Sequence, residues 1–118
     1  MSSRGIPLSA HGALEMFAAP AIMAAPFVLG FGVAATVVSV GVGVSLLALA
    51  LQLESPSRAV PLHAHAGFDY AVAAVATAGG VAIGLVSGEW YATIFLAGIS
   101  AAQVVLTAST RFSATRSA

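Results

Sequence analysis

The chain has 118 residues, of which 59% are hydrophobic and 7% are charged. A water-soluble domain carries about 25% charged residues, so these side chains cannot cover a water-exposed globule. The formal net charge is zero and cysteine is absent, which excludes a basic nucleic-acid-binding surface, disulfides and thiolate sites. We therefore predict an all-α integral membrane protein with a single membrane domain over residues 1–118.

Two long apolar blocks lie on either side of a polar linker at 54–65. A transmembrane helix needs about 20 mostly apolar residues, and each block is long enough for two. Paired glycines at 30–32 divide the first block, and Ser-Gly-Glu at 87–89 divides the second. We predict four transmembrane helices joined as two antiparallel hairpins, with spans at 11–29, 33–53, 66–86 and 89–108.

The arginines predict the orientation in the membrane. Arg4 precedes the first span, Arg58 lies in the linker, and Arg111 and Arg116 follow the fourth span. In a four-span chain these segments all fall on one side, and cytoplasmic segments collect Lys and Arg. Both termini and the linker are therefore expected to be cytoplasmic.

The chain contains an internal repeat. The segment at 7–15, PLSAHGALE, matches the segment at 61–69, PLHAHAGFD, and Gly30 aligns with Gly84 at the same offset. We predict repeat 1 at 7–54 and repeat 2 at 61–111. Because each unit crosses the membrane twice, both enter it from the same side, and an axis along the membrane normal relates them.

The stretch Ala25-Pro26-Phe27-Val28-Leu29-Gly30-Phe31 and the small-residue helix after it, at 38–43, resemble the SPW-repeat family of small bacterial membrane proteins. That family is named for a Ser-Pro-Trp motif in the first helix of a two-helix unit. Only the proline of the motif is present here, as Ala25-Pro26-Phe27. The resemblance implies the two-helix repeat and a location in the bacterial inner (plasma) membrane, and it implies no activity.

Five polar residues lie at similar depth in the predicted spans: His11, Glu15, His65, Asp69 and Gln103. Each acid is about one turn inside the predicted start of the first or third helix. Each histidine precedes its acid by four residues and therefore shares its helix face. Gln103 reaches a comparable depth on the returning fourth helix, so we predict a polar layer in the cytoplasmic leaflet.

This polar layer has two interpretations. A carboxylate near a helix start is stabilised by the macrodipole by about 0.3–1 kcal/mol, so the layer can simply anchor each hairpin and bind the repeats together. Alternatively, repeat symmetry brings two histidines and two acids face to face, where they pass protons, hold a cation, or ligate a metal or haem. Two histidines with two acids are a sparse metal site, and we predict no metal and no cofactor.

Two prolines distinguish the first predicted span from the other three. Pro20 and Pro26 each remove a backbone donor and clash with the preceding turn, so we expect kinks. Their counterparts in the second repeat are Ala74 and Gly80. The two halves are therefore not expected to have identical shapes.

Small residues predict where helices approach closely. Gly80, Gly84 and Gly88 are spaced four apart, the small-xxx-small pattern of membrane helix interfaces. Gly41 and Ser45 offer a second such face. Lipid tails are as apolar as leucine, so this close packing is expected to supply most of the driving force for assembly.

No enzyme signature is present: the chain has no phosphate loop, no zinc-helix motif and no nucleophile with a supporting triad. We predict a non-enzymatic multi-pass protein that acts as a structural or accessory subunit in a membrane complex or homo-oligomer. Two alternatives stay open, a proton- or cation-coupled transporter or channel and a haem- or pigment-binding subunit. The expected partners are the lipid bilayer and membrane subunits, not nucleic acid.

Overall fold

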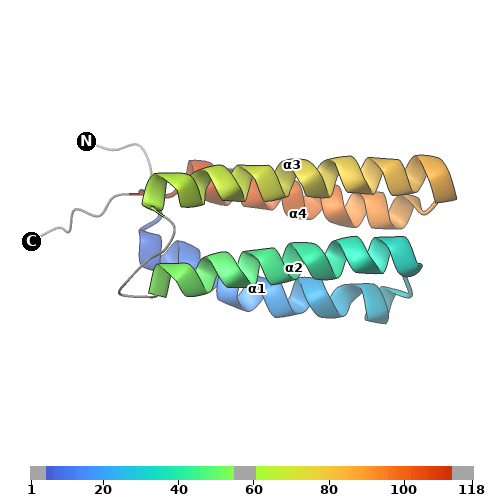
Figure 1. The fold of residues 1–118 in the computed structure, drawn as a ribbon, viewed down its shortest axis with the longest axis horizontal. Coiled ribbons are helices and arrows are strands. Elements are labelled where there is room, and N and C mark those ends of the chain that lie inside the picture. Colours follow the sequence, from blue (N-terminus) through green and yellow to red (C-terminus); the bar gives the residue numbers. More distant parts are fainter. Residues whose placement is uncertain (1–4, 55–60, 113–118) are drawn as a thin grey trace, which may run out of the picture.

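The computed structural model describes residues 5–54 and 61–112, and this part of the chain is helical, with one isolated backbone bridge and no strand. All four of its helices are long and apolar enough to span a membrane, which confirms, for the described residues, the prediction of an all-helical fold with four candidate spans. They are shown in Figure 1: α1 (Leu8–Leu29), α2 (Val33–Glu54), α3 (Leu62–Ser87) and α4 (Trp90–Ala108).

Helices α1 and α3 begin in the same way, directly after a proline in extended conformation, Pro7 or Pro61. The carbonyl oxygens of these prolines accept the backbone N–H groups of His11 and His65, at 3.1 and 2.9 Å. The predicted starts at 11 and 66 were therefore too late, because the apolar run begins after the first helical turn. A proline is well suited to this place, since its fixed φ suits a helix start and its missing donor costs nothing there.

The same two helices end at glycines with positive φ, Gly30 at 70° and Gly88 at 74°. Gly88 therefore terminates α3, and its predicted role in helix packing was wrong. Gly84, which aligns with Gly30 in the sequence, lies inside α3, so the glycines that end α1 and α3 are not equivalent positions of the two segments. With 26 residues against 22, α3 is about one helical turn longer than α1.

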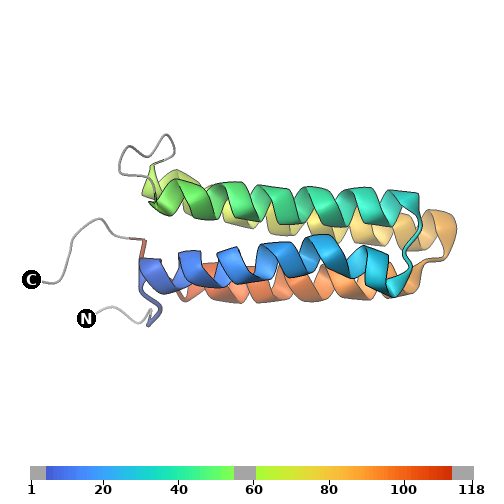
Figure 2. The same ribbon diagram turned by 90° about the horizontal axis from the view of Figure 1, so that it is seen from below.

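The four helices form a bundle of two hairpins. Helix α1 packs mainly against α2, α3 packs mainly against α4, and α2 also packs against α3. In Figures 1 and 2, the described residues next to both termini lie at one end of the bundle, together with the end of α2 and the start of α3. We call this the terminal end. The two interhelical turns lie at the opposite end, which we call the turn end.

Small residues line the contact inside each hairpin. A Cβ on Gly84 would collide with the Trp90 ring, and one on Gly80 would lie 3.2 Å from the Leu96 side chain. On α2, the close approach is at Gly43, where a Cβ would lie 2.9 Å from the Ala19 carbonyl oxygen. Glycine at these positions therefore allows the paired helices to approach closely.

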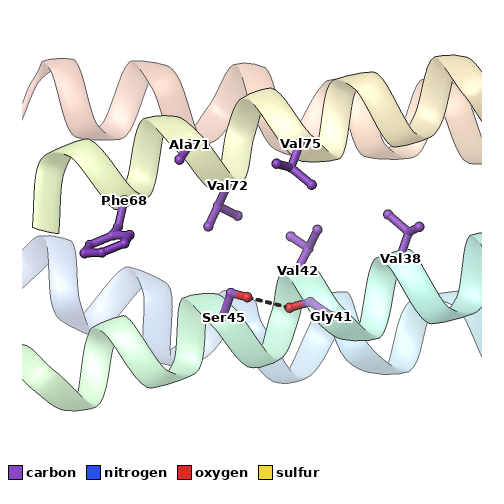
Figure 3. A pocket seen from close by; sticks show the side chains of 8 residues that line it. All are labelled: Val38, Gly41, Val42, Ser45, Phe68, Ala71, Val72 and Val75. Carbon is purple, nitrogen blue, oxygen red and sulfur yellow. Dashed lines mark hydrogen bonds between the residues drawn. The ribbon is translucent and has the colours of Figure 1, made fainter.

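The predicted packing face at Gly41 and Ser45 was wrong for contacts within this chain. A Cβ on Gly41 would meet nothing within 4 Å, and the Ser45 hydroxyl donates to the Gly41 carbonyl oxygen at 2.8 Å. Both residues instead line an open groove between α2 and α3 (Figure 3). The other residues that line this groove are Val38, Val42, Phe68, Ala71, Val72 and Val75.

Helix α1 continues through both of its internal prolines. The segment from Leu8 to Leu29 is one α-helix that contains Pro20 and Pro26. The Pro26 carbonyl oxygen accepts the N–H groups of both Gly30 and Phe31, which closes the C-terminal end of the helix. The kinks expected at these prolines stay a prediction.

Candidate functional site: a buried histidine–carboxylate cluster

Five side chains predicted to share a polar layer meet near the terminal end of the bundle: His11 and Glu15 from α1, His65 and Asp69 from α3, and Gln103 from α4. Each residue is at most 6% exposed. Burying such groups in an apolar bundle costs free energy unless they are paired. We call His11, Glu15, His65 and Asp69 the His–carboxylate cluster.

Contacts within the cluster cross between the two hairpins. His11 Nε2 lies 3.2 Å from Glu15 on its own helix and 2.9 Å from Asp69 Oδ2 on α3. His65 Nε2 lies 3.3 Å from Asp69 on its own helix and 3.5 Å from Glu15 Oε1 on α1. Each imidazole therefore contacts both carboxylates, and each hairpin contributes one imidazole and one carboxylate.

Helix α4 and the residues directly after it supply a second set of polar groups around the cluster. Gln103 Nε2 donates to Glu15 Oε2 at 2.9 Å, and the Thr107 hydroxyl donates to Asp69 Oδ2 at 3.3 Å. His11 Nδ1 lies 2.8 Å from Thr110 Oγ1. Sequence reasoning missed both threonines, although residues 103, 107 and 110 follow the i, i+4, i+7 spacing of one helix face.

The segment after α4 covers the cluster at the terminal end. Ile6 donates its N–H to the Ser109 carbonyl oxygen at 3.0 Å, and the Ile6 carbonyl oxygen accepts the Arg111 N–H at 2.9 Å. The Phe112 ring lies 5.1 Å from the His11 ring and 5.7 Å from the His65 ring, between centroids. Backbone pairing of the two terminal segments thus holds an aromatic ring beside both imidazoles.

The acids lie deeper in their helices than the sequence predicted. Glu15 and Asp69 are each seven residues after the first residue of α1 or α3, about 10 Å along the helix axis. The stabilisation by a helix dipole falls off within the first turn, so the expected macrodipole effect does not apply here. Their environment is set by the histidines and by α4.

Several buried atoms of the cluster have no hydrogen-bond partner among the described residues. These atoms are Nε2 of His11, both ring nitrogens of His65, Oε1 of Glu15 and Oδ1 of Asp69. The carboxylate oxygens nevertheless lie 2.9 to 3.5 Å from the Nε2 atoms of the two imidazoles. The imidazole nitrogens and carboxylate oxygens therefore lie close together, while several of them form no hydrogen bond within the described part of the chain.

The same distances bear on the haem alternative. The His11 and His65 rings are 5.6 Å apart between centroids, with an interplanar angle of 74°. Carboxylate oxygens lie within 3.5 Å of both Nε2 atoms. A porphyrin plane between the imidazoles would have to occupy the space that these oxygens fill, so the geometry does not favour haem.

A separate contact links the hairpins at the turn end. Glu89 Oε2 accepts the backbone N–H of Gly32 at 2.7 Å, which joins the α3–α4 turn to the α1–α2 turn. Trp90 and Tyr91 follow directly and are 50% and 84% exposed. Half-exposed aromatics at a helix end are typical of residues at a membrane interface.

No family model, curated protein or solved structure matches this chain. The resemblance to SPW-repeat proteins therefore depends on the residues quoted for it above.

Proposed function

We propose that this chain is a non-catalytic structural or accessory membrane protein, in which the His–carboxylate cluster fastens one helical hairpin to the other. The observation that carries the proposal is the pairing across hairpins: His11 with Asp69, and His65 with Glu15. Buried polar groups in membrane helices are costly when unpaired and therefore favour the one arrangement that pairs them. The fastened bundle then offers its outer surface to lipid and to other subunits of a complex or homo-oligomer.

The outer surface supports a role in assembly. In the apolar stretch of each candidate span, between 28% and 33% of the residues are buried within the chain, and the others are partly or fully exposed. The exposed residues include large apolar side chains such as Phe17, at 82%, and Val28, at 83%. Such a surface suits a bilayer or neighbouring membrane helices.

The proposal includes a bacterial plasma-membrane location with the terminal end in the cytoplasm. Its support is the distribution of arginine: Arg4, Arg58, Arg111 and Arg116 all belong to segments outside the spans, and none belongs to a short interhelical turn. Cytoplasmic flanks of spans collect arginine.

A cleavable linker tests the fastening role. A protease site inserted between residues 55 and 60 allows the folded, detergent-solubilised protein to be cut into its two hairpins. We expect the wild-type halves to co-elute after cleavage, and the halves of an Asp69→Asn variant to separate. Thr77→Val, an exposed change on the same helix, should behave as wild type. Co-elution of the Asp69→Asn halves as firmly as wild type would contradict the role.

A small transporter or channel is the second candidate. The burial of two acids and two histidines inside candidate spans favours it, because intramembrane ionisable residues commonly mark ion pathways. Cation flux into proteoliposomes that is lost in Glu15→Gln and Asp69→Asn would support this candidate. Flux that is unchanged in both variants would remove it.

A further inference from the structure

The geometry points to a binding site for one divalent transition-metal ion of the zinc class, with His11, Glu15, His65 and Asp69 as its ligands. One donor atom from each of the four residues lies within 4.8 Å of all the others, and all four residues are buried. The inference goes beyond the fastening role, because pairing of the hairpins by itself requires no ion.

Distances between the donor atoms fit a four-coordinate ion. Zinc ligands in a tetrahedral site lie about 2.0 to 2.2 Å from the metal, so the edges of the tetrahedron are about 3.3 to 3.6 Å. The two Nε2 atoms lie 2.9 and 3.3 Å from Asp69 Oδ2, and 3.2 and 3.5 Å from the two carboxylate oxygens of Glu15, Oε2 and Oε1 respectively. Small side-chain adjustments therefore suffice to place all four donors around one ion.

Thr110 determines the tautomer of the neutral His11 ring, that is, which of its two nitrogens carries the hydrogen. Its hydroxyl donates to the Leu106 carbonyl oxygen at 2.6 Å, so the same oxygen accepts the hydrogen of His11 Nδ1 at 2.8 Å. In the neutral ring, Nε2 then carries a lone pair and no hydrogen. That lone pair lies beside two carboxylates and has no hydrogen-bond partner among the residues that the structure describes, so Nε2 can either take up a proton and pair with them or coordinate a cation.

The charge of the cluster also fits a divalent ion. Two carboxylates with two neutral imidazoles carry a net charge of minus two, which one divalent cation balances. Among the described residues, the ion pairs of Glu15 and Asp69 are with histidines, and the one arginine, Arg111, is exposed. Imidazole nitrogen suits zinc, copper, iron and nickel, whereas magnesium and calcium prefer sites built from oxygen ligands.

Helix α4 and the segment directly after it supply the outer contacts that metal sites commonly have. Ligating histidines and carboxylates are usually held by further hydrogen bonds, which fix their orientation. Thr110 holds His11, Gln103 donates to Glu15, and Thr107 donates to Asp69. Three of the four proposed ligands thus have a supporting partner, two of these partners on α4 and one, Thr110, two residues after its end.

Cobalt is the probe that tests the site. The full-length protein in detergent is stripped with a chelator and titrated with Co²⁺ alone, and visible absorption and bound metal are measured. We expect one ion per chain and the intense d–d absorption of a four-coordinate site. His65→Gln should lose this absorption, whereas His63→Gln, a change at an exposed histidine in the same helix turn, should keep it. Thr110→Val should weaken affinity by about 10- to 100-fold.

A measurement on the wild-type protein removes the dependence on variants that fail to fold. X-ray absorption of the zinc-loaded chain should show about four nitrogen or oxygen ligands with outer-shell scattering from two imidazoles. The metal site would be overturned if neither cobalt nor zinc bound stoichiometrically, or if the coordination shell of zinc contained no imidazole. It would also be overturned if His63→Gln and His65→Gln lost the cobalt absorption to the same extent. Separation of the cleaved Asp69→Asn halves without any metal would still support the fastening role. If the wild-type protein binds the metal but the cleaved halves of the Asp69→Asn variant stay together, the fastening role would be contradicted and the metal site would stand.

Discussion

Nε2 of His11 lies 2.9 Å from Oδ2 of Asp69, and this contact joins the first helix of one hairpin to the first helix of the other. Both residues are fully buried. A double-mutant cycle with His11→Gln and Asp69→Asn should therefore give a coupling energy of about 1–3 kcal/mol in unfolding measured in mixed micelles. The cycle between His63→Gln and Asp69→Asn serves as the control. Coupling near zero for His11 and Asp69 would show that the contact does not stabilise the bundle.

Thr110 connects the end of α4 to His11. Thr110→Val keeps the shape of the side chain but leaves the buried His11 Nδ1 without its partner. An unsatisfied buried donor costs about 1–3 kcal/mol, so the free energy of unfolding should fall by that amount. Thr77→Val, at an exposed position of α3, should change it by less than about 0.5 kcal/mol. Equal effects of the two substitutions would contradict the assigned hydrogen bond.

Two glycines at helical positions should respond oppositely to alanine. Gly84→Ala places a methyl group against the Trp90 ring and the Thr93 hydroxyl, which should cost about 1–3 kcal/mol of unfolding free energy. Gly41→Ala meets open space and should be neutral or stabilising by up to about 1 kcal/mol, because alanine favours the helix. Thermal unfolding in detergent compares the pair. A larger loss for Gly41→Ala than for Gly84→Ala would be inconsistent with the observed packing.

Glu89 should protect one backbone amide at the turn end. Glu89→Ala removes the acceptor of the Gly32 N–H, so hydrogen exchange at Gly32 should become faster. Glu89→Gln keeps a carbonyl oxygen within reach and should retain part of the protection. Exchange measured by NMR in micelles compares the three proteins. Unchanged protection of Gly32 in Glu89→Ala would exclude the contact in that medium.

The absence of native cysteine makes the orientation easy to measure. Single cysteines at Ser3, Ser57 and Ser117 should react with a membrane-impermeant reagent only from the cytoplasmic side. A cysteine at Ser87, which ends α3 at the turn end, should react from the other side. Intact cells and inverted vesicles provide the comparison. Labelling of Ser3 and Ser117 from opposite sides would contradict a four-span topology.

The sequence was informative where amino-acid composition and the helical spacing of residues decide the structure. Apolar length gives four spans, and the i, i+4 spacing of His11 with Glu15, and of His65 with Asp69, puts each pair on one helix face. The start of a helix was harder to predict, because hydropathy marks the apolar run and not the polar first turn that follows Pro7 or Pro61.

The choice between neighbouring small residues could not be predicted from spacing. Gly41 and Gly43 both belong to a small-residue helix, yet only Gly43 contacts α1 closely. Which of the two faces a partner depends on the rotation of α2 about its axis, and packing of the whole bundle sets that rotation. The contributions of Thr107 and Thr110 were missed for a related reason, since threonine in a membrane helix also bonds its own backbone.

The backbone bonds of Ile6 with Ser109 and Arg111 bring the beginning and the end of the described chain side by side. The order of the two hairpins along the polypeptide is therefore nearly interchangeable. A circular permutant that connects the original termini through a short loop and opens between residues 55 and 60 would present the second hairpin first. Such a chain should insert into the membrane in the same orientation and form the same four-helix arrangement, since no helix is cut.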